Sequence, residues 1–332
     1  MIEVKELTKS YGPTLAVNRV SFDANAGEVV GFIGPNGAGK TTTMRILTCY
    51  LTADSGSATV AGYDVLESAI DVRKNVGYLP ESAPLYTDMG VVEYLKFMAD
   101  VRDIPKSTRK DRLKTVVEIC GLESVIQKDI GELSKGFRQR VGLAQSLIHD
   151  PPILILDEPT SGLDPSQTIE IRNLIKDIGR EKLVLFSTHI LPEVAATCDR
   201  ILIISRGQLV ANGTLDDLIG QVRSINRLYV AIRGTEETIT PQMNQLEGIT
   251  GFTHVGTNDG VVSYDITLEG DGDDVSELLF QAAVQNGWSL AELRQESIDL
   301  EDVFLHFTSG EQSTTTTSPQ PSESSDTPVD QE

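Results

Sequence analysis

The sequence predicts an α/β fold built around a phosphate-binding loop, followed by a smaller α+β domain. A glycine-rich loop of the pattern G-x-x-x-x-G-K-T stands between a short apolar strand at 28–33 and a helix predicted at 43–50. A second apolar run at 153–156 is typical of a strand buried in a parallel sheet, and it ends in two carboxylates. After residue 226 the predicted order changes to strand, helix, strand, strand, helix, strand, which indicates a separate domain.

The length and composition are those of a globular protein with room for two domains. The chain has 332 residues, of which 39% are hydrophobic and 23% charged. No apolar run approaches the ~18 residues that span a bilayer, and the N-terminus does not read as a signal peptide. Three scattered cysteines, Cys49, Cys120 and Cys198, fit small buried side chains in a reducing cytoplasm.

The formal net charge is −21. The segment 309–332 has five acidic residues, no basic ones, and much Ser, Thr and Pro, so we expect a disordered acidic tail. The rest of the chain still carries −16. Because a surface of this sign repels nucleic acid and anionic lipid head groups, no nucleic-acid partner is expected.

The glycine-rich loop carries the strongest functional signal. Its residues are Gly34, Pro35, Asn36, Gly37, Ala38, Gly39, Lys40, Thr41 and Thr42. The glycines let backbone N–H groups turn toward a phosphate without Cβ clashes, and the following helix adds the partial positive charge of its N-terminus. Lys40 can reach the terminal phosphates, and the Thr41 hydroxyl can hold Mg²⁺. The spacing therefore predicts a site for a nucleoside triphosphate with Mg²⁺.

An antiparallel layer is expected ahead of this loop. Its strands are predicted at 2–6 and 14–24, with a turn at 11–14 between them. Tyr11 lies on that turn, where an aromatic ring either stacks on a nucleotide base or covers the sheet edge. The residues alone leave both alternatives open.

A helical insertion is predicted after the first helix. Apolar residues at helical spacing indicate an ordinary core there, and Ser134 is expected to cap the last of its helices. The predicted elements are strands at 57–62 and 76–79 and helices at 91–101, 107–120 and 135–149.

The strand at 153–157 places two carboxylates at one edge of the sheet. Because catalytic residues cluster at the carboxyl ends of parallel strands, Asp157 is expected to hold Mg²⁺ through water and Glu158 to polarise an attacking water. His189 follows the next buried strand, where it can reach the γ-phosphate, although a lone histidine there is more often structural. The remaining elements are a helix at 165–179, the strand at 183–187 and a hairpin at 200–212.

Taken in chain order, these motifs resemble those of the ATP-binding subunit of ABC transporters. The loop at 34–42 resembles the Walker A motif, 133–137 the ABC signature, and 153–158 the Walker B strand with its catalytic glutamate. Shorter matches are the D-loop at 161–164 and the switch histidine at His189.

The resemblance implies a P-loop ABC ATPase domain over residues 1–220. That domain has a mixed core sheet, an antiparallel β layer and a helical signature subdomain at about 88–150. Such a domain binds and hydrolyses ATP with Mg²⁺. The resemblance implies that Glu158 and His189 are catalytic and that the Tyr11 ring stacks on the base.

Two positions depart from the family pattern. The signature reads Leu-Ser-Lys-Gly-Phe at 133–137, where the family usually has Leu-Ser-Gly-Gly-Gln. The resemblance implies that Ser134 and Gly136 touch the γ-phosphate held by a partner, with Lys135 adding positive charge. Glu81 stands where the family has its Q-loop glutamine, and a carboxylate there can still ligate Mg²⁺ or its water.

The resemblance further implies a subunit that pairs around two ATP molecules, with a second copy of itself or a related ATPase subunit. A separate integral membrane permease then couples the cycle to transport, at the cytoplasmic face of the cell membrane. Leu-Pro-Glu at 79–81 and Leu-Glu-Asp-Val-Phe at 300–304 are similar to a subgroup linked to drug, sodium and polysaccharide export and to gliding motility, so export is expected.

The alternative is a soluble ABC-type ATPase that acts on a macromolecule such as the ribosome or DNA, without a permease. Proteins of that class usually carry two nucleotide domains in one chain or a long coiled-coil insertion. This acidic chain has neither, so the transporter subunit is the reading we adopt.

The remaining segments, at about 221–308, are expected to form a ferredoxin-like accessory domain. Asn258-Asp259-Gly260 is a hairpin turn signal, and an amphipathic helix is predicted at 300–307. A regulatory or dimer-supporting role and a domain without a ligand both stay open. The other predicted elements are strands at 227–233, 251–256, 261–268 and 288–294 and helices at 236–247 and 273–286.

Overall fold

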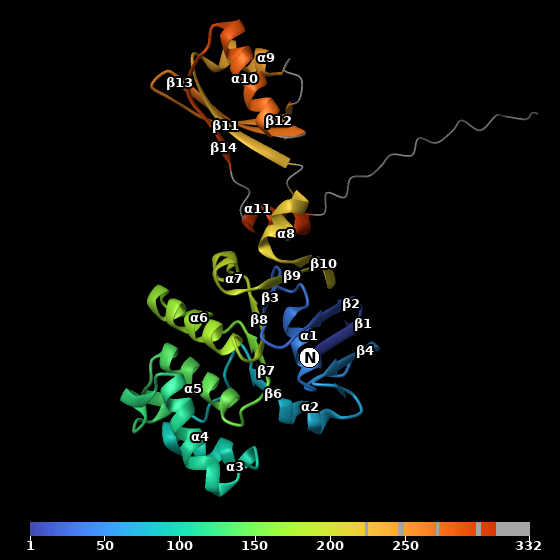
Figure 1. Ribbon diagram of the computed structural model, residues 1–332, viewed down its shortest axis with the longest axis vertical. Helices are drawn as coiled ribbons and strands as arrows, with labels where there is room; N and C mark the ends of the chain where they lie inside the picture. Colours follow the sequence, from blue (N-terminus) through green and yellow to red (C-terminus); the bar gives the residue numbers. More distant parts are fainter. Residues whose placement is uncertain (223–224, 245–248, 270–271, 297–299, 310–332) are drawn as a thin grey trace, which may run out of the picture.

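The structure is a computed structural model that describes residues 1–222, 225–244, 249–269, 272–296 and 300–309. We call residues 1–222 the N-terminal unit and 225–296 the C-terminal module; the domain boundaries given above remain predictions. Figure 1 shows the N-terminal unit with two sheets and the C-terminal module with a third. The predicted acidic tail lies, from residue 310 on, outside the described residues. Ser309, which had been assigned to that tail, belongs to the last helix.

The central sheet of the N-terminal unit is mixed, as predicted. Its six strands run in the order β10-β9-β3-β8-β7-β6, and the pairs from β9 to β6 are parallel. Every residue of β3, β7 and β8 is buried, which explains their continuous apolar sequences. The strands are β3 (Val29–Ile33), β6 (Val76–Leu79), β7 (Ile153–Asp157), β8 (Leu183–Thr188), β9 (Arg200–Ser205) and β10 (Gln208–Gly213).

An antiparallel layer packs against this sheet. Its order is β2-β1-β4-β5, and the core between the two sheets includes Leu7, Val30 and Phe32. The first strand was predicted to end at residue 6 but runs on to Tyr11. Glu6 adopts a positive φ of 48°, and the register between β1 and β2 shifts between Val4 and Leu7. Beyond this irregularity, β1 stays paired with β2 through the polar residues up to Tyr11. The strands are β1 (Ile2–Tyr11), β2 (Thr14–Ala24), β4 (Ser55–Val60) and β5 (Tyr63–Asp64).

Helices surround the central sheet, and α3, α4 and α5 form a group at one end of the N-terminal unit (Figure 1). Its buried residues, which include Leu95, Val116 and Leu143, share one core with Leu154 and Phe186 of the central sheet. The helices are α1 (Lys40–Leu47), α2 (Ala69–Asn75), α3 (Val91–Val101), α4 (Lys106–Ile119), α5 (Lys135–Leu147), α6 (Pro165–Gly179), α7 (Leu191–Thr197) and α8 (Leu215–Val222). Short 3-10 turns at Glu123–Val125 and Ile130–Glu132 link α4 to α5.

The first helix corrects one prediction. It was expected at 43–50, but α1 begins at Lys40 and ends at Leu47. Gly39 precedes it in a left-handed conformation with φ 110°, which lets the chain turn directly from the loop into the helix. The last three residues of the glycine-rich motif are therefore helical.

The C-terminal module is an antiparallel sheet with two helices. Its strand order is β12-β13-β11-β14, and its core includes Val230, Tyr264 and Leu279. Asp259 and Gly260 both have positive φ, 49° and 73°, as the predicted hairpin turn requires. The elements are β11 (Ile225–Arg233), α9 (Glu236–Met243), β12 (Ile249–Asn258), β13 (Val261–Glu269), α10 (Gly272–Asn286) and β14 (Ser289–Glu296).

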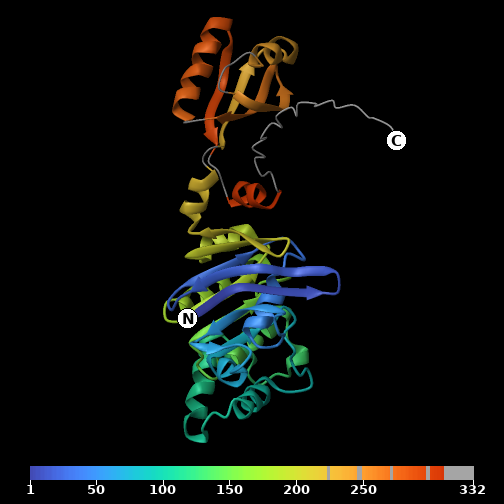
Figure 2. The ribbon, with the colours of Figure 1, turned by 90° about the vertical axis from the view of Figure 1, so that its right-hand side faces the viewer.

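The last helix, α11 (Leu300–Ser309), packs on the N-terminal unit rather than on the C-terminal module's sheet (Figure 2). Leu300 and Val303 lie in a core with Val194 of α7, Ile203 of β9 and Leu218 of α8. The chain thus leaves the N-terminal unit through α8 and returns to it through α11.

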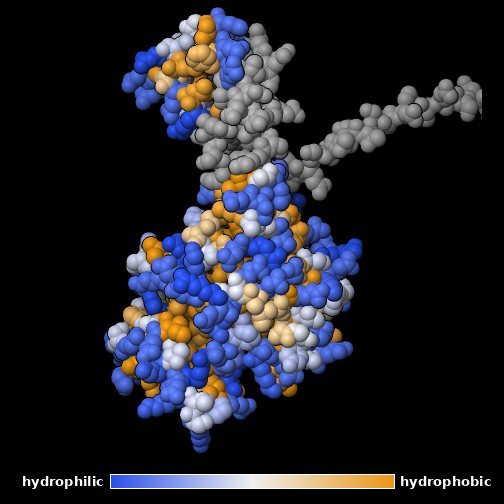
Figure 3. Space-filling model, in the orientation of Figure 1, coloured by the Kyte–Doolittle hydropathy of each residue, from blue (hydrophilic) through white to orange (hydrophobic). Residues whose placement is uncertain are grey.

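Polar residues cover most of the face of the N-terminal unit seen in Figure 3, with small apolar patches between them. Across the ranges described above, every helix is too short or too polar to cross a membrane.

Candidate active site

The glycine-rich loop connects the end of β3 to the start of α1, and its glycines are required by close contacts. A Cβ atom on Gly34 would lie 2.3 Å from the carbonyl oxygen of Ile204, and one on Gly39 would lie 2.4 Å from that of Ala16. Both contacts are shorter than real Cβ atoms make. The loop is therefore pressed against β9 and β2, and a side chain at either position would displace it.

Lys40 is buried at the first position of α1. Its Nζ donates to the carbonyl oxygens of Gly34, at 2.6 Å, and Pro35, at 3.3 Å. Burial lowers the pKa of Lys40 from its usual value, and the carboxylates of Glu158 and Asp157 partly oppose this shift. The ammonium lies inside the loop, where an anion would be held.

Asp157 joins the start of α1 to the ends of two strands. Its Oδ1 accepts from Thr41 Oγ1 at 3.3 Å and from Ser187 Oγ at 2.6 Å. Ser187 Oγ in turn accepts from the backbone N–H of Glu158 at 2.9 Å. Ser187 was not predicted as a site residue. The feature that identifies it is its position on β8, directly opposite Asp157 on the neighbouring strand.

Glu158 and His189 lie together at the carboxyl ends of β7 and β8. His189 Nδ1 lies 2.9 Å from Glu158 Oε2, and since the carboxylate accepts, the ring nitrogen donates. Glu158 is 8% exposed and has a positive φ of 49°. His189, in contrast, is exposed. A nearly buried carboxylate is thus held by a ring that reaches the surface.

The residues predicted to hold Mg²⁺ fall into two groups. Thr41 and Asp157 offer two oxygen atoms at one point, and oxygen donors are those that Mg²⁺ prefers. Glu81 is exposed and lines a separate hollow of about 320 Å³ with Lys135 and Ser161. Burial lowers the pKa of Lys40, and the charge of Glu81, after those of Glu158 and Asp157, partly opposes this shift. The described residues contain no group of three His, Cys, Asp or Glu side chains that could hold a metal alone. An ion here would therefore need further oxygen ligands, from water or from a bound nucleotide.

The signature residues form the start of α5. Ser134 Oγ accepts from the backbone N–H of Phe137 at 3.3 Å, which confirms the predicted N-cap. Gly136 is buried against Gln167 of α6, whose side chain a Cβ would approach to 2.5 Å. Among the described residues, no hydrogen bond or ion pair joins 134–136 to the loop at 34–42. Within one copy of the chain, polar contacts among the described residues therefore do not connect these two motifs.

Tyr11 ends β1, opposite Thr14 on β2. Its side chain is 47% exposed and has no polar or ring partner in the described part of the chain. Two residues after Thr14, Ala16 contacts the glycine-rich loop at Gly39. Tyr11 thus stands at the open end of a strand pair that reaches the loop.

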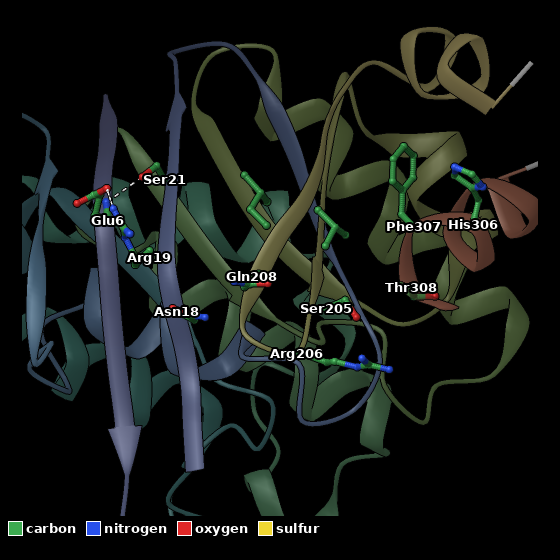
Figure 4. Close-up of a pocket in the computed structure, with 12 residues that line it drawn as sticks. Glu6, Asn18, Arg19, Ser21, Ser205, Arg206, Gln208, His306, Phe307 and Thr308 are labelled. Atoms are coloured by element: carbon green, nitrogen blue, oxygen red, sulfur yellow. Dashed lines mark hydrogen bonds and ion pairs between the residues drawn. The ribbon is translucent and has the colours of Figure 1, made fainter. Parts of the chain in front are cut away.

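A cavity of about 970 Å³ lies between β2, the β9–β10 turn and α11 (Figure 4). Figure 4 shows Arg206 on the turn and Phe307 on α11 at its walls. The cavity contains none of the predicted site residues. Between the lining residues Arg206 and Gln208, Gly207 donates its N–H to the carbonyl oxygen of Ala38 in the loop at 3.0 Å.

Comparison with known proteins gives the family. Residues 17–161 match the model of the family described as ABC transporter, and 129–196 also match one described as AAA domain, putative AbiEii toxin, type IV TA system. The ABC transporter ATP-binding protein YxlF of Bacillus subtilis is 32% identical over 305 residues, 92% of this chain and 98% of YxlF.

Two further proteins extend the comparison. The linearmycin resistance ATP-binding protein LnrL of Bacillus subtilis is 29% identical over 309 residues, 93% of this chain and 98% of LnrL. A solved ATP-binding subunit of an ABC transporter superposes with a TM-score of 0.62 at 30% identity, covering 67% of this chain and 93% of that one.

Proposed function

This chain belongs to the family of ABC transporter ATP-binding subunits, an ATPase family, and from that membership we propose that it hydrolyses ATP to drive a separate membrane permease. One observation carries the proposal: Lys40 and Glu158 lie 3.9 Å apart where β3, β7 and β8 end. A cation able to bind the terminal phosphates thus stands beside a carboxylate able to accept a proton from water.

In this proposal the backbone N–H groups of the loop and the N-terminus of α1 bind the phosphates. The Lys40 ammonium exchanges its carbonyl partners for oxygens of the terminal phosphates. Thr41, Asp157 through water, and Glu81 directly or through water would hold Mg²⁺, which when bound would neutralise charge on the phosphate oxygens. Tyr11 offers its exposed ring to the base.

Glu158 accepts a proton from the attacking water. The water oxygen forms a bond to the γ-phosphorus as the bond from that phosphorus to the bridging oxygen breaks, giving ADP and phosphate. His189 donates to Oε2 of Glu158 and so orients the carboxylate. The exposed side of the His189 ring faces the γ-phosphate. Removal of the γ-phosphate then removes the anion that the partner's signature binds.

We infer that the working unit is a pair of chains. Each copy carries one phosphate loop and one signature, and within a copy the two are not joined. A head-to-tail pair would set Ser134 and Gly136 of one copy against the nucleotide of the other. Lys135, exposed at the start of α5, would add positive charge at that γ-phosphate.

The permease is expected to dock beside Glu81. Exposed aromatic rings border this region: Tyr86 packs edge-on against Phe97 of α3, with ring centroids 5.7 Å apart. Exposed aromatic residues are enriched where proteins associate. The similarity to LnrL, a linearmycin resistance protein, supports export as the direction of transport. Docking to a permease would hold this chain at the cytoplasmic face of the membrane.

The test is affinity purification of the tagged Glu158→Gln chain from detergent-solubilised membranes with ATP and Mg²⁺, followed by mass spectrometry. We expect recovery of a protein with several membrane spans. The matched control is the equally tagged Lys40→Ala chain, which should lose any nucleotide-dependent partner. Recovery of the chain alone, or of ribosomal proteins, would contradict the transport role and leave the ATPase activity standing.

A further inference from the structure

Glu193 is a buried carboxylate on α7 that the site described above does not use. It is 4% exposed, and no ion pair neutralises it in the described part of the chain. Its Oε2 accepts from Thr160 Oγ1 at 2.8 Å and from Thr188 Oγ1 at 3.1 Å, whereas its Oε1 is buried without a partner. Burial of a carboxylate is unfavourable unless hydrogen bonds compensate it. Here the two threonine hydroxyls supply that compensation and hold Oε2 in place.

The two threonines belong to the two segments that carry the catalytic pair. Thr160 lies two residues after Glu158, and Thr188 immediately precedes His189. Thr188 Oγ1 also accepts from the backbone N–H of Ile190 at 3.0 Å, so it holds the chain on both sides of His189. Glu193 thus connects the chain after β7 with the chain after β8.

The Glu158 segment needs such support because its backbone is unfavourable. Glu158 has a φ of 49°, in the left-handed region that non-glycine residues rarely adopt. Its N–H donates to Ser187, and its carbonyl oxygen accepts from Ser161 N at 3.1 Å. Thr160 lies inside this turn, so its bond to Glu193 fixes the turn from the side facing α7.

Helix α7 is anchored by buried contacts. Val194, the next residue after Glu193, is fully buried in a core with Ile33 of β3 and Val303 of α11. The position of Glu193 is therefore set by the packing of the N-terminal unit and the returning helix α11.

We propose that Glu193 is a positioning residue for ATP hydrolysis: it braces the Thr160 and Thr188 segments against each other and thereby maintains the 2.9 Å contact between His189 and Glu158. In this proposal Glu193 acts through Thr160 and Thr188 and not directly on the nucleotide or the attacking water. The inference rests on the roles proposed above for Glu158 and His189.

The test compares Glu193→Ala with Glu193→Gln in the full chain. The alanine variant loses both bonds, and we expect kcat for ATP hydrolysis to fall about 10- to 100-fold with KM changed less than about threefold, because misplacement acts on the chemical step. The glutamine variant keeps an oxygen that accepts from both threonines, so it should recover most of kcat. Glu181→Gln, an exposed glutamate without a side-chain partner in the described residues, is the control and should match the wild type.

Coupling to His189 separates positioning from general destabilisation. If the brace acts through His189, Glu193→Ala should reduce kcat far less in a His189→Ala background than in the wild type. Should Glu193→Ala fail to fold, Thr160→Val and Thr188→Val each remove one hydroxyl at nearly constant shape, and each should lower kcat with KM retained.

Three results would overturn the proposal. They are a wild-type kcat in folded Glu193→Ala, a change confined to KM, or a decrease in kcat by the same factor with and without His189. If neither threonine variant altered kcat, the brace would be equally excluded. The proposed function is tested separately by the wild type and Glu158→Gln, because hydrolysis that survives Glu158→Gln contradicts that function whatever Glu193 does.

Discussion

Lys40 Nζ lies 3.9 Å from Oε1 of Glu158, while the other oxygen of the same carboxylate accepts from His189. One buried side chain therefore links the phosphate loop to the ends of β7 and β8. A γ-phosphate drawn to Lys40 would arrive beside the group that we expect to activate water. Binding and chemistry should accordingly be separable by changing Glu158 alone.

Glu158→Gln should abolish turnover and retain ATP. The amide keeps the shape of the side chain but cannot accept a proton, so we expect the hydrolysis rate to fall about 10²- to 10⁴-fold. ATP affinity should change little, and the unhydrolysed γ-phosphate should hold two chains together. Steady-state ATPase assays, and size-exclusion chromatography with light scattering in ATP, measure both effects. A monomer at saturating ATP would contradict the paired site.

Tyr11→Ala should weaken nucleotide binding without destabilising the fold. The ring is 47% exposed, so its removal leaves no cavity, whereas loss of base stacking costs about 1–3 kcal/mol by alanine substitution. The Kd for ATP should therefore rise roughly 5- to 150-fold, and titration with a fluorescent ATP analogue measures it. Tyr11→Phe keeps the stacking face and serves as the control. Equal affinities in Tyr11→Ala and the wild type would show that the ring only covers the sheet edge.

The parts of the molecule that the sequence predicts well are those set by local chemistry. The helix at 165–179 was predicted with its observed bounds, and in the structure Asp164 caps it and Pro165 begins it. The Ser134 cap follows from the same local preference. The glycine-rich loop and the two carboxylates likewise need residue types at fixed spacing, which a single sequence displays directly.

What the sequence did not predict depends on tertiary contacts. Helices α2, α7 and α8 are seven or eight residues long, too short for apolar periodicity to distinguish from loops. The packing of α11 on α7 depends on a partner surface distant in the chain. Ser187 and Glu193 gain their positions from neighbouring strands and from α7, so neither carries a motif of its own.

The return of α11 to the N-terminal unit predicts that its buried face stabilises that unit. Leu300 is 6% exposed in the core with Val194, whereas Leu305 on the same helix is 60% exposed. Leu300→Ala should lower the free energy of unfolding by about 2–4 kcal/mol, and Leu305→Ala by less than about 0.5 kcal/mol. Urea unfolding followed by circular dichroism compares the two. Equal small effects would mean that α11 does not pack there in solution.

The last prediction concerns His149, which follows α5. Its Nε2 donates to the carbonyl oxygen of Val76 at 3.1 Å, and its Nδ1 is buried without a partner. Burial, reinforced by the positive charge of Arg102, lowers the pKa of His149 to about 4. In the unfolded chain the pKa is about 6.5, so between these values the unfolded state binds a proton that the folded state excludes.

Acidification below pH 6.5 should therefore destabilise the protein through His149, and the stability lost should amount to about 2 kcal/mol between pH 7.5 and 5.0. His149→Gln keeps a donor for Val76 and cannot titrate, so its free energy of unfolding should fall about 2 kcal/mol less over the same interval. Urea unfolding of both proteins at the two pH values isolates this difference, because the other titrating groups are shared. Parallel pH dependences would show that the imidazole is protonated as readily in the folded chain as in the unfolded one.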